Sequence, residues 1–594
     1  MGDSEILRIV VREDIPEDSE LRRAWNDLSR RMEPPEVFYS YEWAIAVQRA
    51  YGGTLKPLLF LAYEGESLVG LVALVRETES RIAFLAANTG DYCDFISEPG
   101  RRGELVEAVL AELKTRNFEH IVLTNLPADS SSVAAISGGA RSQKFFLHSR
   151  QAYLCARVVP GSSEERAKLK QVVASKKRLR RNMRELEKRG KVRVQHDTQW
   201  RQIEPILQTF IRAHVARFLT TGRISNLTRP ARRAFLCELA RELSPLGGVT
   251  VSRLLVGEVP AAWNYGFQFA GSWFWYQPTV NSIYEELSPG YCLLAKIVQQ
   301  ACDSPEIDFV DLGLGAEDYK DRFATASRQT LYVVLNRSFS DHLRMRIRDG
   351  AAAVVKKSPR VEKSIRIILA LARRVRARLR ESGLSGLLRW GAQRIWSSLF
   401  AYDQVLFFEW PATEVNRKEP SDLALRRLDS DILGAAAICY EHDPKALQYL
   451  MRSARRLGSE TDGGFALLTA DETPVHFCWA KDFEGFEMAE LDRTLNAPRP
   501  DAVMIFDCYT PASARGHGFF AAAIAALARE LHAQGKAPWI FGAATNKASL
   551  GGIEESGFQH KFTLGRKRIL FFKQAKGSIP SDSPAATSRS LSAP

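Results

Sequence analysis

One pattern recurs three times along the chain: helices, then an antiparallel hairpin of two apolar strands, a further strand, a helix and a last strand. The hairpin turns are predicted at Glu64-Gly65-Glu66, Gly257-Glu258 and Asp471-Glu472, where short polar turns separate apolar runs. Each repeat has about 150 residues, the size of one domain. The pattern predicts tandem α/β (α+β) modules, each a mixed, mostly antiparallel sheet flanked by helices.

The module boundaries follow from the places where this pattern restarts. Between the second and third modules lies a basic stretch that reads as a helical linker, and the C-terminus is rich in Ser, Ala and Pro without periodicity, which indicates a disordered tail. We therefore predict modules at 1–155, 156–340 and 410–575, a linker at 341–409 and a tail at 576–594.

The positive charge is concentrated in two segments. The 594 residues carry a net charge of +13, and Arg166–Arg193 and Asp341–Phe400 carry +11 each, so the rest of the chain is acidic. Both segments read as helices, the first over Ser163–Arg189, and this pattern disfavours a specific nucleic-acid binder with a basic folded face. The second segment has an apolar stripe at helical spacing. It predicts either a connecting helix packed on a neighbouring domain or peripheral contact of 341–400 with an anionic membrane or polyanion.

Other classes of protein are excluded by composition. The N-terminus lacks the basic start and apolar run of a secretory signal, and no apolar run reaches the roughly 18 residues of a spanning helix. Eight cysteines are scattered without metal-ligand spacing, so we expect reduced thiols and no metal. We expect a cytoplasmic protein, with a location peripheral to the inner membrane face as the alternative.

The most informative stretch runs from Asp507 to Phe520. An apolar strand ends, a loop supplies Arg515-Gly-His-Gly518, and a long helix begins. Such a loop aims backbone N–H groups at one point and the helix dipole adds positive charge there, which predicts a pyrophosphate site. Glycine is needed because a Cβ would keep a phosphate away from the backbone.

With the downstream Asn546, Ser549 and Gly557-Phe558, residues 410–575 resemble the GNAT superfamily of acyl-CoA-dependent N-acyltransferases. The resemblance implies that acetyl-CoA or another acyl-CoA binds here. It departs from the motif at Phe520, where the family usually has Gly or Ala; this ring either narrows the phosphate pocket or faces the core. The cofactor-binding residues implied are Arg515, Gly516, His517, Gly518, Phe519, Asn546 and Ser549.

The same resemblance implies a catalytic arrangement. The strand ending near Tyr509 should splay from its neighbour and free backbone N–H groups for the oxyanion. Asp507, at the strand end, would remove the proton from the acceptor amine, or it caps the loop. Tyr509 would hydrogen-bond the departing thiolate, or it is structural.

Residues 20–335 resemble the CelD/BcsL-type acetyltransferases of cellulose and exopolysaccharide synthesis, a family related to the FemAB transferases. The resemblance rests on the basic Ser175–Arg184 helix, the Leu287-Ser-Pro-Gly290 helix start and the Phe309–Lys320 stretch. It implies a sugar or amine acceptor bound at the loops of these modules. The substrate-binding residues predicted are Asp94, Asp311, Glu317, Tyr319 and Lys320, with a salt-bridged loop as the alternative for the charged Asp311, Glu317 and Lys320.

Together these features predict an acyl-CoA-dependent N- or O-acetyltransferase acting on a polysaccharide or cell-envelope precursor, in which only the C-terminal module binds CoA strongly. Two alternatives stay open. One is a FemAB-like transferase that uses aminoacyl-tRNA, with the basic helix contacting RNA. The other is a non-catalytic scaffold of a polysaccharide-synthesis assembly.

Overall fold

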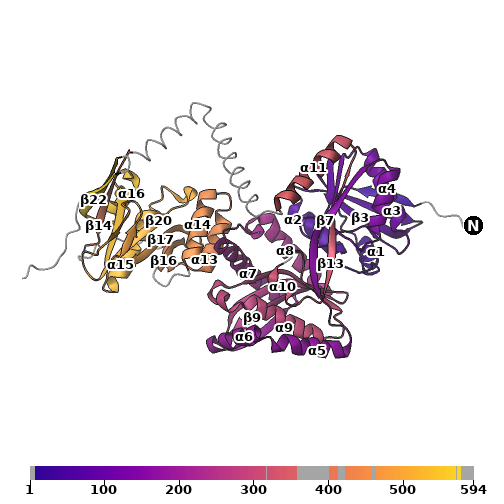
Figure 1. Cartoon of the computed structure of the whole chain (residues 1–594), viewed down its shortest axis with the longest axis horizontal. Coiled ribbons are helices and arrows are strands. Elements are labelled where there is room, and N and C mark those ends of the chain that lie inside the picture. The colour runs from indigo at the N-terminus through magenta and orange to yellow at the C-terminus, as the bar shows by residue number, and fades with distance from the viewer. Residues whose placement is uncertain are drawn as a thin grey trace, which may run out of the picture. The chain divides into compact units, whose positions relative to one another are not determined.

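The computed structural model describes residues 7–315, 317–356, 400–411, 422–457, 463–569 and 572–576. They divide into two compact units, one formed by residues up to 217 together with 226–357 and the other by the C-terminal part of the chain (Figure 1). Residues 357–399 of the predicted linker and 577–594 of the predicted tail lie outside the described residues. No described helix is both long and apolar enough to cross a membrane.

The described residues of the N-terminal unit contain one sheet of thirteen strands, in the order β1-β2-β3-β4-β6-β13-β7-β12-β11-β10-β9-β8, with β5 paired to β3. The strands are β1 (Arg8–Arg12), β2 (Lys56–Glu64), β3 (Ser67–Thr78), β4 (Arg81–Phe84), β5 (Ile96–Ser97), β6 (His120–Pro127), β7 (Phe146–Val158), β8 (Val192–Asp197), β9 (Val249–Val256), β10 (Val259–Phe269), β11 (Ser272–Val280), β12 (Phe309–Asp311) and β13 (Ala326–Asn336).

The two N-terminal modules share this sheet because β13, the last strand of the second module, lies between β6 and β7 of the first. Strand β13 pairs antiparallel with β7 from Ala326 to Asn336, and with β6 from Thr330 onward. Strand β7 in turn pairs with β12 of the second module. The mixed sheets flanked by helices confirm the predicted fold class. Strand β13 joins the two modules through a long-range pairing, which the local sequence pattern does not predict.

Helices cover this sheet: α1 (Ser19–Arg30), α2 (Tyr41–Tyr51), α3 (Arg102–Thr115), α4 (Ser132–Ser142), α5 (Ser163–Ser175), α6 (Lys177–Arg189), α7 (Trp200–Thr220), α8 (Pro230–Leu243), α9 (Pro289–Asp303), α10 (Asp318–Asp321) and α11 (Phe339–Lys356). The prediction of one helix over Ser163–Arg189 is wrong, because Lys176 has a non-helical ψ of 117° and separates α5 from α6. Helix α9 is the core helix of the second module; its Leu293, Leu294, Ile297 and Val298 are fully buried.

The C-terminal unit contains an eight-stranded sheet in the order β15-β16-β17-β20-β21-β14-β22-β23 among its described residues. Its strands, with the separate β18–β19 hairpin, are β14 (Phe400–Glu409), β15 (Leu423–Arg427), β16 (Gly463–Thr469), β17 (Pro474–Asp482), β18 (Phe486–Met488), β19 (Arg493–Leu495), β20 (Ala502–Tyr509), β21 (Ala537–Ala543), β22 (Gln559–Ile569) and β23 (Phe572–Lys576). Its helices are α13 (Ser430–Cys439), α14 (Pro444–Arg456), α15 (Phe519–Ala533) and α16 (Lys547–Ser556).

Strand β14 lies inside the range predicted as the linker, 341–409. It pairs with both β21 and β22, and its Val405, Phe407 and Phe408 are buried in the core of the C-terminal unit. The sheet therefore begins before residue 410. This apolar run forms a central strand because both of its faces are covered.

Candidate active site

The second module has a gap between two diverging strands. β11 and β12 pair in parallel only between Ser272–Phe274 and Phe309–Asp311, although β11 continues to Val280. A bulge in β11 lies between Phe274 and Gln277, where its pairing with β10 shifts register. Beyond Phe274, the edge of β11 that faces β12 therefore pairs with no strand among the residues that the structure describes.

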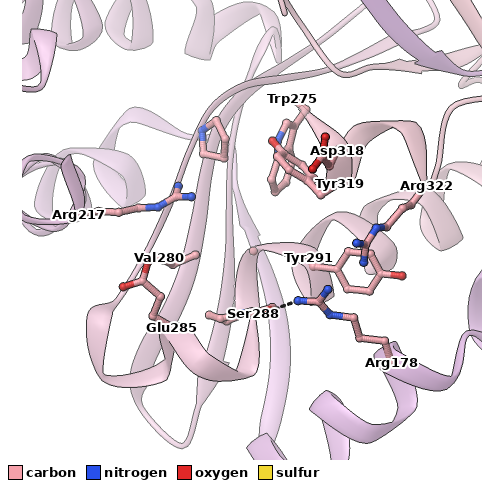
Figure 2. A pocket seen from close by; sticks show the side chains of 13 residues that line it. Arg178, Arg217, Trp275, Val280, Glu285, Ser288, Tyr291, Asp318, Tyr319 and Arg322 are labelled. Carbon is pink, nitrogen blue, oxygen red and sulfur yellow. Dashed lines mark hydrogen bonds between the residues drawn. The ribbon is translucent and has the colours of Figure 1, made fainter. Parts of the chain in front are cut away.

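A pocket of about 380 Å³ opens at this gap (Figure 2). Its wall is formed by α6, the end of α7, β11, the start of α9 and α10 with the residue after it. The lining residues are Arg178, Arg217, Trp275, Pro278, Val280, Glu285, Ser288, Pro289, Gly290, Tyr291, Asp318, Tyr319 and Arg322.

The mouth of the pocket is basic on the side of α9. The guanidinium of Arg178 donates a hydrogen bond to Ser288 Oγ at 2.9 Å and lies 5.7 Å from the ring centre of Tyr291. Burial raises the pKa of Tyr291, while the positive charges of Arg322 and Arg178 oppose that rise. Ser288 has a left-handed φ of 49° and Pro289 begins α9, so the positive end of the helix dipole points into this region.

The opposite wall holds a hydrogen-bonded aromatic pair. The indole Nε1 of Trp275 donates to the hydroxyl oxygen of Tyr319 at 3.1 Å. Burial raises the pKa of Tyr319, and the nearby carboxylate of Glu317 raises it further. Tyr319 therefore stays protonated at neutral pH, with its hydroxyl at the pocket wall. The carboxylates of Glu285 and Asp318 also line the pocket and are exposed.

The C-terminal unit repeats this geometry. β20 and β21 pair in parallel from Ala502–Ala537 to Ile505–Ile540 and no further, although β20 continues to Tyr509. A register shift against β17 marks a bulge before Tyr509. The splay expected at the end of this strand is thus present, and α15 begins beyond it.

The comparisons with known proteins bear on the second module. Residues 174–321 match the family model described as an acetyltransferase (GNAT) domain. This part of the chain is therefore similar to GNAT acetyltransferase domains, and residues 174–321 are called the GNAT domain below. All the residues that line the pocket, except Arg322, lie within the matched range. No curated protein matches the chain.

Three similar solved structures each cover slightly more than half of the chain. FemX is 9% identical, covers 55% of this chain and 98% of its own, and has a TM-score of 0.37. The C-terminal domain of a putative lysylphosphatidylglycerol synthetase from Agrobacterium fabrum is 11% identical, with coverages of 57% and 96% and a TM-score of 0.34. A tandem GNAT protein from the clavulanic acid biosynthesis pathway is 12% identical, with 55% and 98% coverage and a TM-score of 0.31.

Of the residues predicted to bind substrate, Tyr319 lines the pocket of the GNAT domain. Lys320 is buried behind it, where its ammonium donates to the carbonyl oxygen of Leu314 at 3.0 Å and lies 3.8 Å from the carboxylate of the exposed Glu317. This fits the salt-bridged loop that was the alternative for these residues.

Asp311 and Asp94 lie away from this pocket. Asp311 is fully buried and accepts hydrogen bonds from Arg157 Nε at 2.7 Å and from the hydroxyl of Tyr92 at 2.8 Å. Asp94 is buried in the first module, where it accepts from Ser130 Oγ at 2.6 Å and pairs with Arg102 at 3.5 Å. The environment of Asp311 is that of an ion pair at the junction of the two N-terminal modules.

The predicted phosphate loop of the C-terminal module is exposed from Arg515 to Gly518. Gly516 and Gly518 have left-handed φ values of 82° and 74°, and a Cβ added at either would meet no atom within 4 Å. Open space therefore lies beside the backbone where a phosphate would approach. Arg515 is held by its Nε, which donates to Thr510 O at 3.1 Å, and the ring of His517 stacks on Phe519.

Phe520 faces the core. A Cβ on Gly552 of α16 would lie 2.5 Å from the Phe520 ring, and His476 of β17 lies 5.6 Å away on ring centres. The bulky side chain thus fills the space between α15, α16 and β17. Of the two readings of this departure from the motif, the structure supports the core-facing one.

Asn546 and Ser549 form the N-cap of α16, since Asn546 Oδ1 accepts a hydrogen bond from the Ser549 backbone N–H at 3.2 Å. Asp507 has a left-handed φ of 48°, and its carboxylate accepts from Arg456 at 2.8 Å. The ring of Tyr509 stacks on Tyr449 at 4.4 Å, and its buried hydroxyl has no hydrogen-bond partner among the described residues.

Sequence reasoning missed most of the pocket of the GNAT domain. Arg178 lies in a basic segment for which the sequence predicts only a helix and its positive charge. Arg322 follows the Phe309–Lys320 stretch, which carries the resemblance. The sequence predicts a helix start at Ser288-Pro289-Gly290, where α9 begins, but it predicts no binding or catalytic role for these residues. A proline at the first position of a helix beside a splayed strand is the signal that would have found the site.

Proposed function

We propose that the protein transfers an acyl group from an acyl-CoA, such as acetyl-CoA, to an amine or hydroxyl of a polysaccharide or cell-envelope precursor. The observation that carries the proposal is the pocket at the diverging strands β11 and β12. It lies almost wholly within the residues that match the GNAT family model. A helix N-terminus, arginine side chains and the unpaired edge of β11 all lie at this pocket.

The residues present fit an acyl-CoA. Arg178 and Arg322, with the positive end of the α9 dipole, would bind its phosphates, because guanidinium groups and helix N-termini both favour phosphate oxygens. The bound thioester supplies an activated acyl group. The volume of about 380 Å³ is within the range of pockets that take small ligands.

The chain's own groups then serve the transfer. The free edge of β11 beyond Phe274 presents backbone N–H groups that can stabilise an oxyanion. Asp318 or Glu285, both at the pocket surface, takes the proton of the acceptor. Tyr319, whose hydroxyl lines the pocket, donates a hydrogen bond that stabilises the leaving thiolate as the carbon–sulfur bond breaks.

The C-terminal module is proposed as a second donor site. The open backbone of Gly516 and Gly518 supports phosphate binding there, with Arg515, His517 and Phe519 in the same loop and Asn546 and Ser549 at the next helix start. Asp507 would act as the base in an ion pair with Arg456, and Tyr509 offers an unpartnered hydroxyl for the thiolate.

Titration of acetyl-CoA into the full-length protein by calorimetry tests both sites. Arg178→Glu should abolish binding to the GNAT domain, and Gly518→Trp should abolish binding to the C-terminal module, because the indole fills the open space at the loop. Each variant should therefore lose one of two binding events. The matched control is Arg180→Glu, which changes the same charge on α6 at an exposed position outside the pocket lining.

The outcomes separate the alternatives. If Gly518→Trp lost all binding of acetyl-CoA and Arg178→Glu lost none, the donor site would lie in the C-terminal module, as the sequence predicts. If the wild type bound no acetyl-CoA, the proposal that an acyl-CoA is the donor would be wrong. Transfer from aminoacyl-tRNA by such a protein would then establish the tRNA-dependent alternative, and its absence would favour the scaffold. The acceptor class rests on the CelD/BcsL resemblance and is tested by supplying amino sugars and hydroxylated glycans to the loaded enzyme.

A further inference from the structure

Helix α11 exposes a row of large apolar side chains. Phe339, Leu343 and Ile347 are 59%, 45% and 64% exposed, and they follow one another at four-residue spacing. Residues four apart lie on one face of a helix, so the three form a single stripe. Phe146, exposed to 38% at the start of β7, extends the stripe, because its ring lies edge-on to that of Phe339 at 5.4 Å.

An adjoining face of α11 is fixed to the sheet. His342 is buried beside Phe146, and Asp349 accepts hydrogen bonds from His148 Nε2 at 2.9 Å and from Arg150 Nε at 3.0 Å. These contacts with β7 set the rotation of the helix. They therefore hold the apolar stripe in its exposed orientation.

Basic side chains flank the stripe. Arg344, Arg346 and Arg348 are exposed; Arg344 also pairs with Asp341 at 3.1 Å. Phe and Leu on one face with arginines beside them is the composition of a helix that lies in the plane of an anionic bilayer surface. The arginines are positioned to meet lipid phosphates, and the apolar side chains have the lengths needed to enter the region of the acyl chains.

We propose that α11 docks the protein on an anionic lipid surface, with Phe339, Leu343 and Ile347 inserted below the headgroups and Arg344, Arg346 and Arg348 at the phosphates. Charge complementarity selects this occupant, since a nucleic acid would pair with the arginines and leave the apolar stripe in water. This inference is independent of the acyl-transfer proposal, because none of its residues lines the pocket.

The test is flotation of the full-length protein with vesicles of phosphatidylcholine containing about a third phosphatidylglycerol, beside vesicles of phosphatidylcholine alone. The wild type should float with the anionic vesicles. The triple variant Phe339→Ser, Leu343→Ser, Ile347→Ser should bind them at least about tenfold more weakly, since each side chain loses apolar burial in the bilayer. The double variant Arg346→Glu, Arg348→Glu should lose binding to anionic vesicles as well.

The control is Leu246→Ser, which removes an apolar side chain exposed to 50% elsewhere in the same unit and should bind like the wild type. Equal flotation of the wild type and the triple variant would overturn the proposal. So would equal binding to both kinds of vesicle. A wild type that stays off the vesicles, while the triple variant changes the size of the free protein in solution, would show that the stripe is covered by protein, either a second copy or residues 357–399, and would also overturn it.

Discussion

The indole Nε1 of Trp275 donates a hydrogen bond to the hydroxyl oxygen of Tyr319 at 3.1 Å. Trp275 lies on β11, one of the two strands that diverge in the GNAT domain, and Tyr319 lies on α10, which follows the other strand, β12. The bond holds the phenol at the wall of the pocket. Burial keeps the phenol protonated, because it raises the pKa of Tyr319.

If Tyr319 stabilises the leaving thiolate by a hydrogen bond, Tyr319→Phe should lower kcat by about a hundredfold and leave KM for the acyl donor nearly unchanged. Steady-state kinetics of acyl transfer measure both. The matched control is Tyr291→Phe, which removes a hydroxyl from the same pocket and should change kcat little. A rise in KM without a fall in kcat would assign Tyr319 to binding.

Asp311 should be a structural residue. Asp311→Asn removes the buried negative charge that lies 2.7 Å from the partly buried guanidinium of Arg157, and breaking a buried ion pair typically costs about 3–5 kcal/mol of unfolding free energy. Urea denaturation of the N-terminal unit measures the loss. Asp303→Asn, which breaks an exposed pair with Lys170, should leave the midpoint unchanged. A stable Asp311→Asn protein with weakened acceptor binding would restore the substrate role predicted from the sequence.

The sequence predicted the parts of these sites that are local. The loop from Arg515 to Gly518, the cap at Asn546 and the splay after Ile505 each depend on a few neighbouring residues and a strand that ends. The pocket of the GNAT domain depends on residues that are far apart in the sequence, because Arg178 and Tyr319 line the same pocket only after β11, α9 and β12 have formed.

The different surroundings of Asp311 and Tyr319 also result from long-range packing. Asp311 and Tyr319 stand eight positions apart in one motif, yet the first is buried against Arg157, which lies 154 positions earlier, and the second faces the pocket. The direct pairing of β7 with β12 places Arg157 beside Asp311 at the end of β12. No local periodicity encodes that pairing. Phe520 was ambiguous for a similar reason, because its partner Gly552 belongs to the next helix.

Acid should destabilise the C-terminal unit through His476. Burial lowers the pKa of this imidazole from 6.5 to about 3. Below pH 6.5 the unfolded chain therefore takes up a proton that the folded unit rejects, and stability falls as the pH falls toward 3. The slope is about 1.4 kcal/mol per pH unit, so the loss at pH 5 is about 2 kcal/mol. His476→Gln should flatten this dependence in denaturation curves measured between pH 5 and 7, whereas His442→Gln, at an exposed position, should not.

Phe520 and Gly518, two residues apart in the C-terminal module, should separate stability from ligand binding. Phe520→Ala opens a cavity against Gly552 and His476, and we expect it to lower the unfolding free energy by about 1–3 kcal/mol while the affinity for acetyl-CoA is kept. Gly518→Trp places its side chain in open space and strains a left-handed residue, so binding to this module should vanish at a smaller cost in stability. Unfolding curves and calorimetry on the same two proteins give both quantities. Loss of acetyl-CoA binding in a well-folded Phe520→Ala protein would mean that the ring shapes the phosphate site after all, and tight binding by Gly518→Trp would exclude the loop from the donor site.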